Sequence, residues 1–148
     1  MPEFQLGSIS TGTLRPEDLL PAFADAAESL CGDMAVRAVS TARIYLEPDA
    51  IVEDEQMQTC LEELRCLLDD ACPPFIYFGS LPGDGADFGF WPDLEAIDAS
   101  CERQHHRRTH NPDTGEIVLE DDSVIVQVND HGNVTVMDME RSVIWSVA

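Results

Sequence analysis

The stretch that decides the fold is residues 116–147, EIVLEDDSVIVQVNDHGNVTVMDMERSVIWSV. Four short runs rich in valine and isoleucine follow one another there: EIVLED, SVIVQVN, NVTVMDM and SVIWSV. Branched residues of this kind favour strands, and the polar segments 129–133 and 140–141 separate runs as hairpin turns do. The pattern predicts a meander of antiparallel strands.

Further strands are expected upstream of this meander. FIYFGS at 75–80 and ADFGFW at 86–91 are apolar runs on either side of the turn-forming residues 82–85, so they predict a hairpin. FQLGSIST at 4–11 has partly alternating apolar residues and is a candidate opening strand. The segment HNPDTGE, residues 110–116, is expected to be a loop.

Helices are expected in the first half of the chain. Residues 14–32 have Pro16 in a first-turn position and Gly32 where a C-terminal cap belongs. Residues 34–46 fit a helix or a strand, and we favour the helix. Residues 50–71 repeat apolar side chains at steps of three and four, which predicts an amphipathic helix. A short helix is expected within residues 92–104.

This order of elements predicts the class of fold. With 148 residues the chain fits one domain, residues 1–148, that is large enough to bury a core. Helices followed by a run of strands are typical of α+β proteins. We therefore expect N-terminal helices packed on a C-terminal antiparallel β-sheet, a meander of about five strands.

Charge limits the classes of partner. The chain has 29 acidic residues against eight arginines, no lysine, and a formal net charge of −21. Such a protein repels nucleic acid and anionic membranes and attracts basic surfaces. Bias of a whole acidic proteome and simple solubility explain the acidity equally well. A third explanation is that acidic side chains imitate a phosphate backbone.

Location follows from what the sequence lacks. The first residues show neither a basic nor an apolar region of a signal peptide, and no apolar run approaches the ~20 residues that span a bilayer. Five cysteines, an odd number, suit reduced thiols better than a set of disulfides. We expect a cytoplasmic protein.

The helix at 50–71 supplies the candidate binding surface. Glu55, Glu62 and Asp69 are seven residues apart, which places them on one side of a helix at intervals of roughly 10 Å. Neighbouring acids widen this stripe, and Trp91 is expected to be an exposed aromatic anchor. The predicted partner-binding residues are Glu53, Asp54, Glu55, Glu62, Glu63, Asp69, Asp70 and Trp91.

A basic segment interrupts the acidic chain at 101–110, CERQHHRRTH, which holds three of the four histidines. Cys101 and His105 are four residues apart, as are His106 and His110, and each pair could share a helix face and bind zinc. One helix cannot aim all four at one ion, however, and the segment runs into Asn111–Pro112. We favour a solvated loop that balances charge.

Two further interpretations of this segment stay open. Its arginines could pair with the acid-rich helix, within the molecule or across a homodimer, at about 0–1 kcal/mol for a surface pair. Alternatively, a neighbouring histidine could activate Cys101 as a nucleophile, with Asp113 or Glu116 as a base.

Two stretches, YFGSLPGDGADFGFWPDLEAI and NDHGNVTVMDMERSVIW, resemble small acidic proteins of unknown function from phages and other mobile elements. In charge, size and lack of lysine the whole chain is similar to DNA-mimic inhibitors: anti-restriction proteins, anti-CRISPR proteins and immunity proteins against nuclease toxins. That class shares a pattern of charge, so the resemblance implies a kind of function and assigns no residue roles. The basic segment departs from it.

The sequence therefore predicts a non-enzymatic inhibitor or decoy, without a cofactor, that binds the basic nucleic-acid-binding surface of a partner protein. The alternative is a small hydrolase or lyase that uses residues 101–110, with or without a metal. A third reading is a non-catalytic accessory protein from an organism whose proteome is acidic.

Overall fold

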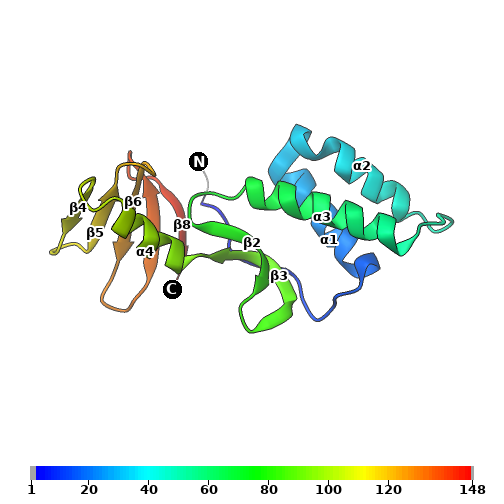
Figure 1. Ribbon diagram of the computed structural model, residues 1–148, viewed down its shortest axis with the longest axis horizontal. Coiled ribbons are helices and arrows are strands. Elements are labelled where there is room, and N and C mark those ends of the chain that lie inside the picture. The colour runs from blue at the N-terminus through cyan, green and yellow to red at the C-terminus, as the bar shows by residue number, and fades with distance from the viewer. Residues whose placement is uncertain (1–2, 148) are drawn as a thin grey trace. The chain divides into compact units, whose positions relative to one another are not determined.

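The computed structural model describes residues 3–147 (Figure 1). Its internal contacts divide these residues into two compact units, each assembled from separate segments of the chain. One, here the helical unit, contains residues 7–72 and 77–91. The other, here the sheet unit, contains residues 3–6, 73–76 and 92–147. The single domain expected from the sequence stays a prediction.

Three helices dominate the helical unit: α1 (Pro16–Cys31), α2 (Val36–Tyr45) and α3 (Asp54–Asp70). Pro16 occupies the first turn of α1, where a missing N–H leaves no bond unmade. Gly32 ends the helix at φ 54°, a left-handed value that glycine adopts without strain, and opens the 3₁₀ turn η1 (Gly32–Ala35). The three helices that the sequence predicts are confirmed.

A three-stranded sheet completes this unit, in the order β1 (Gly7–Ser10), β3 (Asp84–Pro92) and β2 (Ile76–Leu81). The predicted hairpin and opening strand are therefore present. A Cβ on Gly89 would lie 2.1 Å from the carbonyl oxygen of Gly7, so the approach of β1 to β3 requires glycine there. Phe23 of α1 packs edge-on against Phe78 of β2, with ring centroids 5.1 Å apart, which joins helix and sheet.

The sheet unit contains the predicted meander. Its strands, in spatial order, are β4 (Arg108–Asn111), β5 (Glu116–Leu119), β6 (Val124–Val128), β7 (Val134–Asp138) and β8 (Val143–Val147), all antiparallel. The short helix α4 (Leu94–Arg103) precedes them, with the Asp93 side chain capping its first turn. Trp145 is fully buried, and its indole N–H donates to the carbonyl of Pro74 at 2.8 Å. The α+β class with a five-stranded antiparallel sheet is confirmed.

Two boundaries differ from those expected. Residues 108–111, expected in a loop, form β4, a fully exposed edge strand without the apolar alternation that reveals buried strands. The third helix begins at Asp54 and not at 50, because Glu53 is its N-cap and donates its N–H to the Gln56 side chain. Within residues 3–147, no helix is long and apolar enough to cross a membrane.

Candidate functional site

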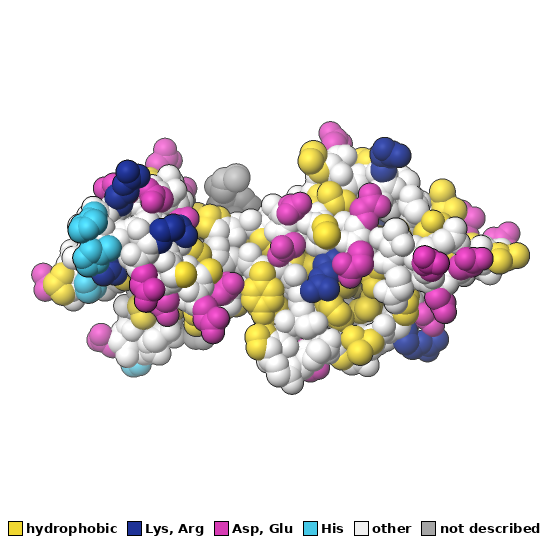
Figure 2. Space-filling model, viewed as in Figure 1, with side chains coloured by type: hydrophobic (Ala, Val, Ile, Leu, Met, Phe, Trp, Pro, Cys, Tyr) yellow, Lys and Arg dark blue, Asp and Glu magenta, His cyan; other side chains and the backbone are white. Residues whose placement is uncertain are grey.

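The acidic surface is built on α3, whose opposite face is anchored in the core. Cys60, Leu61, Leu64 and Leu68 recur at helical spacing and are buried. The acidic side chains consequently point to solvent, and Figure 2 shows carboxylates gathered over this helix. The exposed residues at its start and along it are the predicted Glu53, Asp54, Glu55, Glu62, Glu63, Asp69 and Asp70.

Two of these carboxylates already have partners inside the helical unit. Glu62 lies 3.7 Å from the Arg65 guanidinium, one turn further along α3. Asp69 accepts a hydrogen bond of 3.0 Å from the backbone N–H of Phe78, so it ties the end of α3 to β2. Both therefore have local roles in the fold, and they are weaker candidates for a partner-binding surface than the sequence indicated.

Other carboxylates of α3 are free to meet a partner. Among residues 3–147, Glu55, Glu63 and Asp70 form no ion pair, and their side chains accept no hydrogen bond. The Glu63 charge is felt locally, because it adds to the effect of burial in raising the pKa of the Cys60 thiol. On α1, by contrast, Asp25 and Glu28 both bind Arg43 of α2, at 2.6 and 3.0 Å. The acids of α1 are thus partnered within the helical unit, whereas Glu55, Glu63 and Asp70 of α3 have no partner among residues 3–147.

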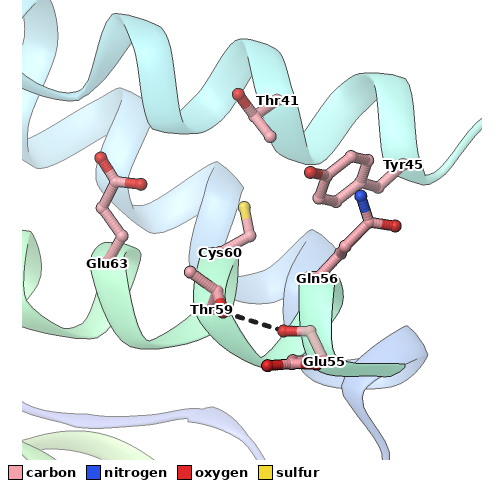
Figure 3. Close-up of a pocket in the computed structure, with 7 residues that line it drawn as sticks. All are labelled: Thr41, Tyr45, Glu55, Gln56, Thr59, Cys60 and Glu63. Atoms are coloured by element: carbon pink, nitrogen blue, oxygen red, sulfur yellow. Dashed lines mark hydrogen bonds between the residues drawn. The ribbon is translucent and has the colours of Figure 1, made fainter. Parts of the chain in front are cut away.

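A hollow lies where α3 faces α2 (Figure 3). It encloses about 310 Å³, and Thr41 and Tyr45 of α2 line it opposite five residues of α3. Glu63 points from α3 toward α2, and the Thr59 hydroxyl donates to the Glu55 carbonyl. The α3 residues that line it are Glu55, Gln56, Thr59, Cys60 and Glu63.

Trp91 is not the exposed anchor that the sequence predicted. Its side chain is half-buried at the end of β3, and its indole N–H donates to the carbonyl of Gly79 at 2.9 Å. The hairpin partner β2 supplies this acceptor, so the ring holds the two strands together. The exposed apolar side chains of the helical unit lie elsewhere: Leu14, Met34, Val36, Ile44 and Ile51.

The basic segment has a structural role in the sheet unit. Gln104, only 1% exposed, uses both ends of its amide: Nε2 donates to the Asp122 carboxylate, and Oε1 accepts from the Asp121 N–H at 2.9 Å. Arg103 lies 3.5 Å from Asp122, and Arg107 lies 3.1 Å from Asp121. These contacts fasten the end of α4 to the β5–β6 turn.

The predictions for this segment are thereby refined. Arg103 and Arg107 pair with the β5–β6 turn of their own unit. Pairing of the segment's arginines with the acid-rich helix, within the molecule or across a homodimer, stays a prediction. The segment is solvated and balances charge as expected, but it is only partly a loop, since it begins in α4 and ends in β4. Figure 2 shows imidazoles and arginines gathered over this region.

The positions of Cys101 and the histidines do not favour the hydrolase alternative. Cys101 is buried in α4, whereas His105, His106 and His110 are exposed, and the first two rings pack edge to face at 4.9 Å. Within residues 3–147, no group of three histidine, cysteine or acidic side chains is placed to hold a metal ion. The zinc alternative therefore has no site in the described part of the chain.

The two candidate bases, Asp113 and Glu116, are also poorly placed for catalysis. Asp113 is exposed in the turn between β4 and β5. Glu116 is held by both guanidinium nitrogens of Arg141, at 2.8 and 3.0 Å, and these hydrogen bonds lower its pKa. A carboxylate with a lowered pKa is a poorer base than a free one.

The roles of several of these residues were not predicted from the sequence. Gln104 and Arg141 act through partners 17 and 25 residues away, and no local pattern announces such contacts. The hollow between α2 and α3 depends on how two helices pack. The one available signal was the helical spacing of Glu55, Thr59 and Glu63, which places them on one side of α3.

Comparison with known proteins adds no relative from which a function could be transferred. No protein-family model, no curated protein and no solved structure matches this chain.

Proposed function

We propose that this chain is a non-enzymatic binding protein that occupies the nucleic-acid-binding surface of a basic partner protein. The observation that carries the proposal is the row of exposed carboxylates on α3. Three of them, Glu55, Glu63 and Asp70, form no ion pair within residues 3–147. The whole helical unit has 16 acidic residues against four arginines.

The mechanism is electrostatic competition. Arginines and lysines that bind phosphates also bind carboxylates, and Glu55, Glu63 and Asp70 follow one another along α3 at roughly 10–12 Å. This spacing is wider than that of phosphates in DNA, so the proposal requires a match to selected cations of the partner and not to a whole groove. Binding should be fast and should weaken as salt screens the charges.

This function places the chain among acidic inhibitors of the anti-restriction, anti-CRISPR or nuclease-immunity kind. A cytoplasmic location, and an origin in a phage or other mobile element, are parts of the same proposal. No cofactor and no direct contact with nucleic acid or membrane enter the mechanism.

A capture experiment followed by competition tests the proposal. The tagged chain is incubated with lysate at low and moderate salt, and retained proteins are identified by mass spectrometry. We expect a nucleic-acid-binding protein that is retained at low salt and released as salt rises. The purified partner should then release a labelled DNA duplex when the chain is added. Capture of a partner whose DNA binding is unaffected would contradict the decoy mechanism.

Charge reversal identifies the surface. The triple variant Glu55→Lys, Glu63→Lys and Asp70→Lys should retain its helical circular dichroism and lose at least tenfold in affinity for the captured partner. The control reverses the exposed Asp113, Glu120 and Glu140 in the sheet unit, which is the same change of net charge. An equal loss in the control would show that net charge, and not the α3 surface, determines binding.

A further inference from the structure

The hollow beside Glu63 is one part of a longer groove. Three hollows of about 310, 320 and 290 Å³ lie along α3. The first two face η1 and α2, and the third faces the end of α1 together with Met34 of η1. The first and second share Thr41 and Glu63, and the second and third share Met34 and Leu67. Because neighbouring hollows share lining residues, they adjoin one another along α3, and together they are called the groove here.

The length of this groove suits a helix. It runs from Glu55 to Asp70 along α3, which is about 22 Å at the rise of an α-helix. A partner helix of roughly 15 residues has the same length. Grooves between paired helices are a recurrent place for amphipathic helices to bind.

Charge in the groove selects a basic occupant. Four carboxylates line it, those of Asp33, Glu55, Glu63 and Asp70, and Arg37 is the single cation that does so among the described residues. Ionised carboxylates only accept hydrogen bonds, and lysine and arginine only donate them.

Three neutral polar side chains of the groove are already engaged. Thr41 donates its hydroxyl to the carbonyl of Arg37, and Thr59 donates to that of Glu55. The Cys60 thiol is directed at the carbonyl of Ala38. Besides its carboxylates, the groove offers a ligand the Tyr45 hydroxyl and the Gln56 amide nitrogen, which form no hydrogen bond within residues 3–147.

The groove also offers apolar surface. Met34, which lines two of the three hollows, is 80% exposed. Ile44 is 60% exposed and lies one turn beyond the groove-lining Thr41 on α2. Leu30 and Leu67 line the third hollow. An occupant with both apolar and basic side chains would cover these residues and meet the carboxylates.

We infer that the groove between α2 and α3 is the docking surface for a basic amphipathic helix of the partner protein. This inference rests on the proposed function and makes it more specific, because it names the element of the partner that binds. The apolar face of that helix lies against Met34 and Ile44, and its lysines or arginines reach Glu55, Glu63 and Asp70.

The test uses two synthetic peptides of identical composition and charge. One 16-residue peptide has leucines at helical spacing among lysines and arginines, and the other has the same residues in a scrambled order without an apolar face. Fluorescence anisotropy with the full chain should give at least tenfold tighter binding of the amphipathic peptide. Amide NMR shifts should concentrate at residues such as Thr41, Tyr45 and Thr59. Equal affinity for both peptides would overturn the inference.

Adjacent glutamates provide a matched pair of variants. Glu63 lines the groove, whereas Glu62 lies on another side of α3, where it lines a hollow beside Phe88. Glu63→Gln should weaken the amphipathic peptide about threefold to fivefold, and Glu62→Gln should change its affinity by less than twofold. Equal effects of the two substitutions would contradict docking in the groove.

Two exposed apolar residues, Met34 and Ile44, allow the apolar contribution to binding to be separated from the contribution of charge. The double variant Met34→Ser and Ile44→Ser should remove most of the preference for the amphipathic peptide, while Val128→Ser with Met139→Ser in the sheet unit should leave it intact. If the preference survives the first double variant, the groove is not the docking surface.

The outcomes of the two proposals can be told apart. Loss of partner binding in the triple reversal, combined with equal affinity for both peptides, would retain the decoy function and remove the docked helix. A preference for the amphipathic peptide, combined with a captured partner whose DNA binding is unaffected, would retain the groove and remove the decoy function.

Discussion

The acidic helix α3 and the basic segment 101–110 are both dense in charge, yet the structure treats them in opposite ways. Two of the three arginines in the basic segment have counter-charges within the sheet unit: Arg107 pairs with Asp121 and Arg103 with Asp122. The buried Gln104 forms hydrogen bonds with the same two aspartates. On α3, Glu55, Glu63 and Asp70 meet no such partner among residues 3–147. The comparison teaches that a cluster of charge points to a binding function when its own molecule leaves it unanswered.

The largest effect that would test this contrast is expected at Gln104. Gln104→Ala removes both hydrogen bonds of a buried amide and leaves the Asp121 N–H without its acceptor. We expect a loss of about 3 kcal/mol in the free energy of unfolding, because unsatisfied polar groups are costly when buried. Urea unfolding followed by Trp145 fluorescence, in a Trp91→Phe background, measures it in the sheet unit.

The control for this prediction is Gln127→Ala. The Gln127 amide donates a single exposed hydrogen bond to the Thr114 carbonyl, so its loss should change the free energy of unfolding by less than about 1 kcal/mol. Similar losses in the free energy of unfolding for Gln104→Ala and Gln127→Ala would mean that the contacts of Gln104 do not stabilise the sheet unit.

A smaller effect should distinguish two adjacent carboxylates of α3. Asp69→Ala loses the hydrogen bond from the Phe78 N–H and should lower the free energy of unfolding by about 1 kcal/mol. Asp70→Ala removes an equal charge without a partner and should leave stability nearly unchanged. Thermal unfolding of both variants compares them directly. A larger loss of stability in Asp70→Ala than in Asp69→Ala would contradict the assignment of Asp69 as partnered and Asp70 as free.

The smallest effect is a dependence on pH in the sheet unit. Arg141 lowers the pKa of Glu116 below its ordinary value of 4.5, so the folded state favours the ionised carboxylate. The stabilisation by this pair is complete above about pH 4.5 and is lost as pH falls through the lowered pKa. Wild type and Glu116→Gln should therefore differ in melting temperature at pH 7 and converge in acid. A constant difference down to the lowest pH would contradict the pairing.

Much of the fold could be predicted from the sequence because its signals are local. The apolar period of α3 and the valine-rich runs of β6 and β7 lie within single elements, and both elements formed as expected. The strand β4 was missed since an edge strand that buries no side chain has no apolar pattern to display.

The candidate site was predictable only in part. Exposure of the acids on α3 follows from helical geometry, and the structure places them accordingly. Their division into partnered and free members does not, because the partner of Asp69 comes from β2, nine residues further on. Trp91 shows the same limit: an aromatic residue near the end of a strand gives no sign of whether its N–H will find an acceptor.

The order in which the chain enters its two units bears on how the protein is made. Apart from residues 73–76, the helical unit consists of the continuous span 7–91, so all of it has been synthesised once residue 91 is added. The sheet unit needs β8, whose Ile144 carbonyl accepts the N–H of Phe4. Domains generally fold as they are synthesised, so the helical unit would fold while the chain is still on the ribosome. Residues 3–6 would then remain unpaired until β8, more than a hundred residues later, has been made.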